Sequence, residues 1–531
     1  MVEWRLWRNY NEKHVKGANV SVNKSVNRIV TGSGVILAGT LIGLLFDINV
    51  KRVLTSYLSP GDFGIYSFAL TVISITGVIA TLGLGDGVAR YIAYFRGRNE
   101  DHKINELITS ATVMGLSASA IAMIASPALF EHLTGNGFDT QGEISAVIKI
   151  MIFTIPATIL LNVAVGVYRG FDRTNVNMYF NKLLRPLSLL LFSLAAVHFG
   201  LSFHGIVFMD LLSIIFTFGV MSVYFIKKPP FEPKLKFKFS EPTKELFRYS
   251  FPILITSTLI NFMTWTATIM LGYFKSAEVV GAYNVVSPLV GFLAIIVSPM
   301  GFVYVPVVSK LWGENKTELV GPIYQIMTKW CFLLTFPIFV LIFVYPEYLL
   351  TNIYGADYAS GAMVLRILAL GALANSYFGV NYHTLMASGN SDLLMKCSIA
   401  SAGMNVLLNF LLIPQYGILG AAIAYSVSFS ANEVFMTFKV WKNQNMHPFT
   451  SMYRRLTLIN IFIVWVMLAA RKALMLTGAN WEYAAFIILY FAIIQYANIL
   501  DENEKNIVGE IRKGIFDTIG VRISYIFRIH A

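Results

Sequence analysis

The fold class is decided by residues 204–226, which read HGIVFMDLLSIIFTFGVMSVYFI and contain one charged side chain, Asp210. A helix needs about 20 predominantly apolar residues to cross a bilayer. Similar runs recur along the chain, and the sequence predicts fourteen spans, at 30–50, 63–95, 106–130, 144–168, 179–199, 204–226, 249–274, 279–309, 322–345, 361–386, 394–413, 418–438, 456–476 and 482–499. We therefore expect an all-α polytopic membrane protein with 14 transmembrane helices.

Composition and charge distribution agree with a membrane protein. Of the 531 residues, 56% are hydrophobic and 13% are charged, whereas soluble domains carry about 25% charged residues. With the N-terminus inside, 32 of the 41 lysines and arginines fall in inner segments, four fall within spans, and five fall in outer loops, namely Lys51, Arg52, Lys275, Arg471 and Lys472. This bias follows the positive-inside rule. It predicts a cell-membrane protein with both termini in the cytoplasm, and it explains the net charge of +12 without a nucleic-acid partner.

An internal repeat divides the chain. A shift of 217 residues aligns Gly64-Ile-Tyr66 with Gly281-Ala-Tyr283, and the same register persists to the end of both segments. Two pseudo-symmetric six-helix lobes, related by an axis along the membrane normal, are therefore expected, with an extra helix pair that has no counterpart. The predicted divisions are a cytoplasmic segment at 1–28, an N-lobe at 29–227, a basic linker at 228–248, a C-lobe at 249–440, the extra pair at 441–500 and an amphipathic cytoplasmic tail at 501–531.

Ionisable residues inside spans are costly, so each one is a functional hypothesis. Lys149 and Arg366 differ by the repeat offset and are predicted to face each other across a central cavity. Lysine and arginine bind phosphate oxygens strongly, so this pair is a predicted diphosphate site. The alternative interpretation is that each cation only lies near the outer end of a helix and extends toward the interface.

The other charges within spans leave their roles open. Arg90 follows Asp86 by four residues on one helix face, so it can bind substrate or pair with Asp86. Asp47, Asp86 and Glu433 are candidates for coupling to protons or Na⁺, or for balancing the basic residues. Asp210 has no evident partner in the sequence. Another charge, on Lys329, lies close enough to a span end to extend to the interface.

The sequence carries only weak signatures of a catalytic, cofactor-binding or metal-binding site. Gly83-Leu-Gly-Asp-Gly87 lies within a span and is not followed by GK[ST], so it is not a phosphate-binding loop. The two cysteines, Cys331 and Cys397, lie in apolar spans without CxxC spacing. We therefore expect no enzyme activity, no cofactor, no metal site and no catalytic residue.

Several blocks of sequence resemble a known family. They include Leu58-Ser-Pro-Gly-Asp-Phe-Gly64-Ile-Tyr66 and a block formed by Met386-Ala-Ser-Gly-Asn390, Asn405-Val-Leu-Leu-Asn409-Phe-Leu-Leu-Ile-Pro414 and Tyr416-Gly-Ile-Leu-Gly-Ala-Ala422. This last block is the most specific. Together the blocks cover about residues 30–440. On these residues the chain resembles the Wzx-type polysaccharide-unit flippases of the multidrug/oligosaccharidyl-lipid/polysaccharide superfamily.

The resemblance implies a V-shaped pair of lobes, alternating access and a polyprenyl- or dolichyl-diphosphate-linked oligosaccharide moved from the inner to the outer leaflet. The expected partners are this lipid-linked oligosaccharide and membrane lipids, and a glycan polymerase or transferase is a further candidate. A cation-coupled multidrug exporter of the same superfamily is the main alternative, although such exporters usually stop at twelve spans. A membrane glycosyltransferase or polymerase is the second alternative, but no predicted extramembrane loop is long enough to carry its catalytic acid.

Overall fold

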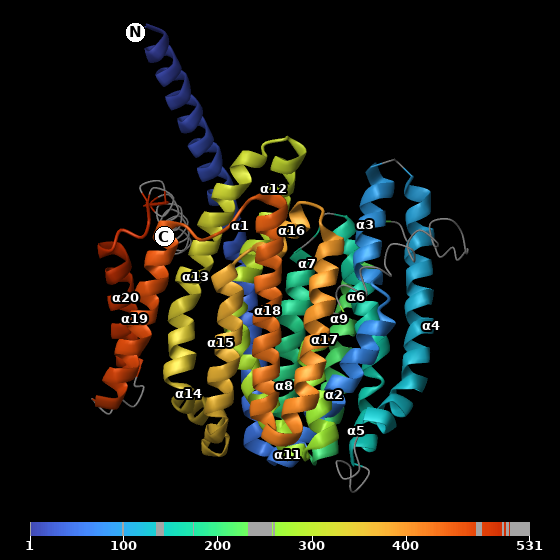
Figure 1. Cartoon of the computed structure of the whole chain (residues 1–531). Coiled ribbons are helices and arrows are strands. Elements are labelled where there is room, and N and C mark those ends of the chain that lie inside the picture. The colour runs from blue at the N-terminus through green and yellow to red at the C-terminus, as the bar shows by residue number, and fades with distance from the viewer. Residues whose placement is uncertain are drawn as a thin grey trace, which may run out of the picture.

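The computed structural model contains only helices, turns and loops in the part of the chain that it describes (Figure 1). The described residues are 2–97, 100–133, 143–171, 173, 175–231, 258, 261–473, 480–501, 504, 505 and 509. Among them, eleven helices are long and apolar enough to cross a membrane, and two shorter apolar helices lie at Val297–Ser309 and Ala485–Tyr496. The expected class, an all-α polytopic membrane protein, is confirmed, whereas the count of fourteen spans stays a prediction.

The N-terminal half is built from helices that run side by side (Figure 1). Their bounds are α1 Val2–Tyr57, α2 Pro60–Ala80, α3 Leu84–Gly97, α4 Asp101–Leu133, α5 Glu143–Met151, α6 Thr154–Gly170, α7 Asn175–Asn177, the π-helix η1 Met178–Leu184, α8 Arg185–His198 and α9 Phe203–Lys227. The start of α2 is fixed by its sequence, because the Ser59 side chain accepts a hydrogen bond from the Asp62 backbone N–H and Pro60 occupies the first turn.

One predicted span of this half is two helices. The expected run at 63–95 breaks between α2 and α3, where Leu82 and Gly83 have positive φ angles of 49° and 66°. A right-handed helix cannot pass through two consecutive residues in this conformation. Gly83, the first residue of the glycine-rich stretch at 83–87, therefore lies at the break between α2 and α3.

The C-terminal half is also helical in its described residues and has its own interruptions. Residues 261–274 are helical. They are followed by α11 Ala277–Val286, the 3₁₀ segment η2 Ser287–Ala294, α12 Val297–Gly313, η3 Thr317–Leu319, α13 Val320–Val344, α14 Pro346–Tyr354, η4 Ala356–Gly361, α15 Ala362–Phe378, α16 Asn381–Ala387, α17 Ser391–Tyr416 and α18 Ile418–Gln444. The predicted span at 279–309 is interrupted by η2, which begins with Ser287 and Pro288. Proline cannot donate the backbone hydrogen bond that would continue an α-helix.

The last two helices, α19 Ser451–Ala473 and α20 Asn480–Tyr496, form a pair at one edge of the bundle and pack against α13 (Figure 1). Pro337 lies inside α13 and cannot donate to the carbonyl of Leu333 one turn earlier. The Tyr490 hydroxyl of α20 donates to that carbonyl at 3.0 Å. Tyr483 donates to the carbonyl of Pro337 at 2.8 Å. The pair therefore supplies hydrogen bonds that a membrane interior would not.

Candidate functional site

A cavity of about 410 Å³ lies between the two halves. It is bordered by α1, α2, α11, η2, α15, α18 and residues 264–268. Its polar lining residues are Lys51, Thr71, Ser74, Thr264, Thr268, Asn284, Ser287 and Asn375. Among these described lining residues Lys51 carries the sole charge, so the central cavity has a cationic point in an otherwise neutral polar wall.

The position of Lys51 corrects the sequence analysis, which placed it in an outer loop. The first membrane helix does not end near residue 50, because α1 continues to Tyr57. The Lys51 ammonium donates a hydrogen bond to the backbone carbonyl of Asn284 at 2.8 Å. The Asn284 side-chain oxygen in turn accepts from Thr268 at 3.2 Å. A lysine from the N-terminal half is therefore anchored on a helix of the C-terminal half.

A second group of charges surrounds Asp47, one turn before Lys51 on α1. Lys51, Lys182 and Arg185 all lie close enough to act on the Asp47 charge. Gly43 lets α1 approach the π-helix closely, since a Cβ at this position would lie 3.0 Å from the Lys182 carbonyl oxygen. The exposed side chains of Lys182 and Arg185 are thus set beside Asp47.

Lys182 and Arg185 belong to the cations counted on the inner side, at the start of the predicted span 179–199, and both fall within the helical span 175–198. Two signals were available in the sequence. Lys182 and Arg185 are three residues apart, and Lys51 follows Asp47 by four, so each pair lies on one helix face.

Asp210 does have a partner, although its partner could not be recognised from sequence. The Tyr66 hydroxyl of α2 donates to its carboxylate at 2.8 Å, and Arg185 also acts on its charge. Tyr66 is the repeat counterpart of Tyr283, which lines the central cavity. The Gly-x-Tyr motif that revealed the repeat therefore places one tyrosine at an internal carboxylate and the other at the cavity wall.

Glu433 lies directly behind the cavity wall. Its side chain is 2% exposed, and it accepts hydrogen bonds from Asn375 at 3.1 Å and from Asn381 at 2.9 Å. Asn375 also lines the central cavity. Within the described part of the chain Glu433 makes no ion pair. Its buried carboxyl group, beside the cavity, is hydrogen-bonded by the neutral side-chain amides of Asn375 and Asn381.

The structure does not bring Lys149 and Arg366 together. Arg366 on α15 forms an ion pair with Glu347 of α14 at 3.0 Å, and Arg471 of α19 binds the same carboxylate at 3.0 Å. Lys149 on α5 is exposed and makes no ion pair among the described residues. Neither cation lines the central cavity in this conformation. Their assignment to the diphosphate stays a prediction.

The electrostatics of Glu347 follow from these two guanidinium groups. Partial burial raises the pKa of this carboxyl group, but its own backbone hydrogen bond, Arg471 and Arg366 lower it more, so the pKa lies below its ordinary value. The group thus stays ionised between the two arginines. The side chains of the predicted pair Asp86 and Arg90, in contrast, lie outside the described residues.

The two halves touch through backbone at the end of the bundle opposite the N-terminus, where α2 and α11 lie together (Figure 1). A Cβ on Gly64 would overlap the Ala277 carbonyl oxygen, and one on Gly281 would lie 2.5 Å from the Pro60 oxygen. Gly64 and Gly281 are equivalent positions of the repeat. The repeat motif is therefore a glycine crossing that joins the halves beyond the central cavity.

A family model described as "Polysaccharide biosynthesis protein" matches residues 29–312, more than half of the chain. The chain belongs to the polysaccharide biosynthesis protein family. A second model, MatE, matches residues 252–411. A probable low-salt glycan biosynthesis flippase of Haloferax volcanii is 23% identical over 445 residues, which covers 83% of this chain and 89% of the relative.

Solved structures show the fold of this chain in other transporters. The lipid II flippase MurJ in its inward closed conformation has a TM-score of 0.67 at 13% identity, covering 87% of this chain and 98% of that chain. An inward-facing multidrug resistance MATE transporter of the MOP superfamily has a TM-score of 0.70 at 14% identity, covering 79% and 98%. The resemblance to Wzx-type members of this superfamily is confirmed, and both structures share the fold.

Proposed function

We propose that this member of the polysaccharide biosynthesis protein family is a flippase for a lipid-linked oligosaccharide. The observation that carries the proposal is the polar cavity with Lys51 between two repeat-related halves, which also approach each other closely at the glycine crossing of Gly64 and Gly281. Two-lobed repeats of this kind transport by rocking one lobe against the other around a site at their interface. The cargo would move from the inner to the outer leaflet as the crossing opens.

The proposed diphosphate site is Lys51 together with Lys182 and Arg185. Phosphate oxygens form strong charge-assisted hydrogen bonds with ammonium and guanidinium groups. Asp47 holds these cations together in the absence of cargo and would be displaced by the more highly charged diphosphate. We propose that Arg366, Lys149 and Arg90 act as further diphosphate ligands. The diphosphate would contact them after the two halves have moved relative to each other.

Membrane orientation and partners complete the proposal. Both termini lie in the cytoplasm and the protein resides in the cell membrane, which is supported by the excess of lysine and arginine in the predicted inner segments. The predicted divisions at residues 227, 248, 440 and 500 separate the lobes, linker, extra pair and tail. A glycan polymerase or transferase that consumes the flipped product would draw the cargo outward.

Replacing the cavity cation tests the site. Lys51→Gln is expected to lower the rate of flipping of a labelled polyprenyl-diphosphate sugar in proteoliposomes by about 10- to 100-fold, because a charge-assisted contact to phosphate is lost. Arg52→Gln is the matched control, since Arg52 is exposed on the same helix and does not line the cavity. Equal rates for Lys51→Gln and wild type would refute the site but not the flippase.

A second result would refute the function itself. If the wild-type protein moves none of several lipid-linked glycans but exports cationic dyes, the multidrug-exporter alternative replaces the flippase. The MatE match over residues 252–411 makes this the alternative to test.

We propose Glu433 as the ion-coupling group, with Asp47 and Asp86 as the other candidates. Glu433→Gln keeps the shape of the side chain and one acceptor for Asn381 while removing the titratable group. Flipping by this variant is expected to become independent of an imposed pH or Na⁺ gradient, whereas the exposed control Glu318→Gln should respond as wild type does. The measurement is the flipping rate with and without each gradient. A gradient response that survives in Glu433→Gln assigns coupling to another carboxylate.

A further inference from the structure

The segment that carries Lys182 is the π-helix η1, and Pro186 accounts for its form. Pro186 lies four residues after Lys182. In an α-helix the residue at this position donates to the Lys182 carbonyl, but proline has no N–H and its ring collides with that carbonyl. The wider π turn avoids this conflict, and the Arg185 backbone N–H donates to the carbonyl of Phe180, five residues earlier. Pro186 therefore favours the π form of the segment.

Two contacts fix the ends of this segment on α9. The Phe180 ring packs against the Tyr224 ring with centroids 5.5 Å apart. The hydroxyl groups of Ser188 and Thr217 share a hydrogen bond of 2.9 Å. Eight residues separate Phe180 from Ser188, whereas seven separate their partners on α9. The π turn accommodates the additional residue, because each of its hydrogen bonds spans five residues rather than four.

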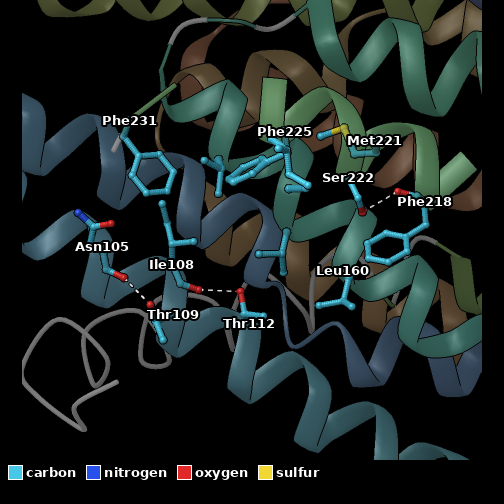
Figure 2. A pocket seen from close by; sticks show the side chains of 14 residues that line it. Asn105, Ile108, Thr109, Thr112, Leu160, Phe218, Met221, Ser222, Phe225 and Phe231 are labelled. Carbon is cyan, nitrogen blue, oxygen red and sulfur yellow. Dashed lines mark hydrogen bonds between the residues drawn. The ribbon is translucent and has the colours of Figure 1, made fainter. Parts of the chain in front are cut away.

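The two anchors lie on a packed part of α9. Phe218, Ser222 and Phe225 of the same helix border an apolar pocket of about 330 Å³ between α4, α6 and α9 (Figure 2). Thr217 and Tyr224 do not line this pocket, and α8 packs against α9. The anchors are therefore away from the empty space, and they hold the π segment in one register.

The π segment also packs against α1, which carries Asp47. A Cβ on Gly43 would lie 3.0 Å from the Lys182 carbonyl oxygen, and one on Gly39 would lie 3.1 Å from the Met178 side chain. Helix α1 thus follows the π segment closely over one turn. Conversion of the segment to an α-helix would turn its residues by about 100° relative to α8, the rotation of one residue. The position of Lys182 beside Asp47 therefore depends on the π form.

The internal repeat contains the same helix without the proline. At the offset of 217 residues, Gly403 takes the place of Pro186 and Ile399 takes the place of Lys182. Both lie in α17, which is α-helical throughout its length. At these equivalent positions the C-terminal half has neither the proline, the π turn nor the cation. The three features therefore occur together in one half.

We propose that Pro186 is a positioning residue for the cargo diphosphate, because it holds η1 in the π form and thereby keeps Lys182 beside Asp47. The inference rests on the proposed flippase function and on the site of Lys51, Lys182 and Arg185. Pro186 is buried whereas Lys182 is exposed, so the proline acts through the lysine. A cation that is already in place when the diphosphate arrives binds it at a lower entropic cost.

A cross-linking experiment tests this geometry without requiring transport. Asp47→Cys is combined with Lys182→Cys, a short bis-maleimide is added, and the linked peptides are quantified by mass spectrometry. The two natural cysteines are buried and contribute a low background. Pro186→Ala supplies the missing N–H and is expected to lower the linked fraction several-fold. Pro306→Ala, in the α-helix α12, is the matched control and should leave the fraction unchanged.

A double-mutant comparison tests whether Pro186 acts through Lys182. Flipping of a labelled polyprenyl-diphosphate sugar is expected to fall about tenfold in Pro186→Ala, but less than about twofold when the same change is made in Lys182→Gln. A structural role alone would lower flipping equally in both backgrounds. If Pro186→Ala does not fold, Pro186→Ser supplies the same N–H and takes its place.

Two results would overturn the positioning role. One is an equal loss of flipping in both backgrounds, and the other is a linked fraction that Pro186→Ala leaves unchanged. Failure of the proposed function has a different signature, since the wild-type protein would then flip no lipid-linked glycan. The role in cargo binding would fall with that function, while the cross-linking result would still decide whether Pro186 sets the position of Lys182.

Discussion

Glu504→Ala is expected to lower the free energy of unfolding by about 3–5 kcal/mol, because it leaves the Lys329 ammonium buried without its counter-charge. The two side chains are 8% and 0% exposed, and their charged atoms are 2.5 Å apart. Trp330 also donates to the Glu504 carboxylate at 3.0 Å. The expectation that Lys329 extends to the membrane interface is therefore wrong, because a carboxylate 175 residues further along the chain meets it inside the protein.

This ion pair also explains how the segment that follows α20 is held. Lys329 donates to the backbone carbonyl of Ile499 at 3.2 Å, and Glu504 accepts from the Asp501 backbone N–H at 2.9 Å. The segment after α20 is thereby joined to α13, against which the extra helix pair packs. Loss of Glu504 should loosen that pair as well as lower stability.

Thermal and denaturant unfolding in detergent micelles measures the effect. The matched control is Glu314→Ala, whose ion pair with Lys316 is exposed and is expected to contribute less than about 1 kcal/mol. Replacing both Lys329 and Glu504 with methionine should recover part of the loss, because no unpaired charge then remains. Similar unfolding curves for Glu504→Ala and Glu314→Ala would contradict the buried pair.

Gly64→Ala is expected to reduce flipping by about 5- to 150-fold, because the added Cβ overlaps the Ala277 carbonyl and separates α2 from α11. Overpacking of a close contact costs about 1–3 kcal/mol, and a change of that size shifts a conformational equilibrium by such a factor. Gly281→Ala should act in the same way, since its Cβ meets Pro60. The change disfavours the conformation in which the halves touch.

The conformational shift can be measured directly with a cysteine introduced at Ser287 in the central cavity. The natural cysteines, Cys331 and Cys397, are buried and leave a low background. Labelling by an impermeant maleimide added outside should increase in Gly64→Ala and stay at the wild-type level in Gly77→Ala. Gly77 lies on the same helix with nothing within 4 Å of its missing Cβ. Unchanged labelling in Gly64→Ala would show that the crossing does not close the cavity.

The sequence by itself determined the class of fold and the family. Apolar length predicts a span from one local window, and the position of lysine and arginine predicts orientation, since the energy of a helix in a bilayer is nearly a sum over its own residues. The offset of 217 residues also identified Gly64 and Gly281 as equivalent positions, because equivalent helices of the two halves are subject to the same packing constraint. None of these inferences required knowledge of which helices are neighbours.

The tertiary structure alone decided the partners of the internal charges. Asp210 meets Tyr66, Arg366 meets Glu347 and Lys329 meets Glu504, each across different helices. Lys51 became a cavity residue only because α1 continues beyond the apolar run, and its carbonyl partner belongs to the other half of the chain. A charge inside a membrane is stabilised by whichever group packing brings within hydrogen-bond distance. That neighbour depends on helix rotation and contact, which no local pattern of residues encodes.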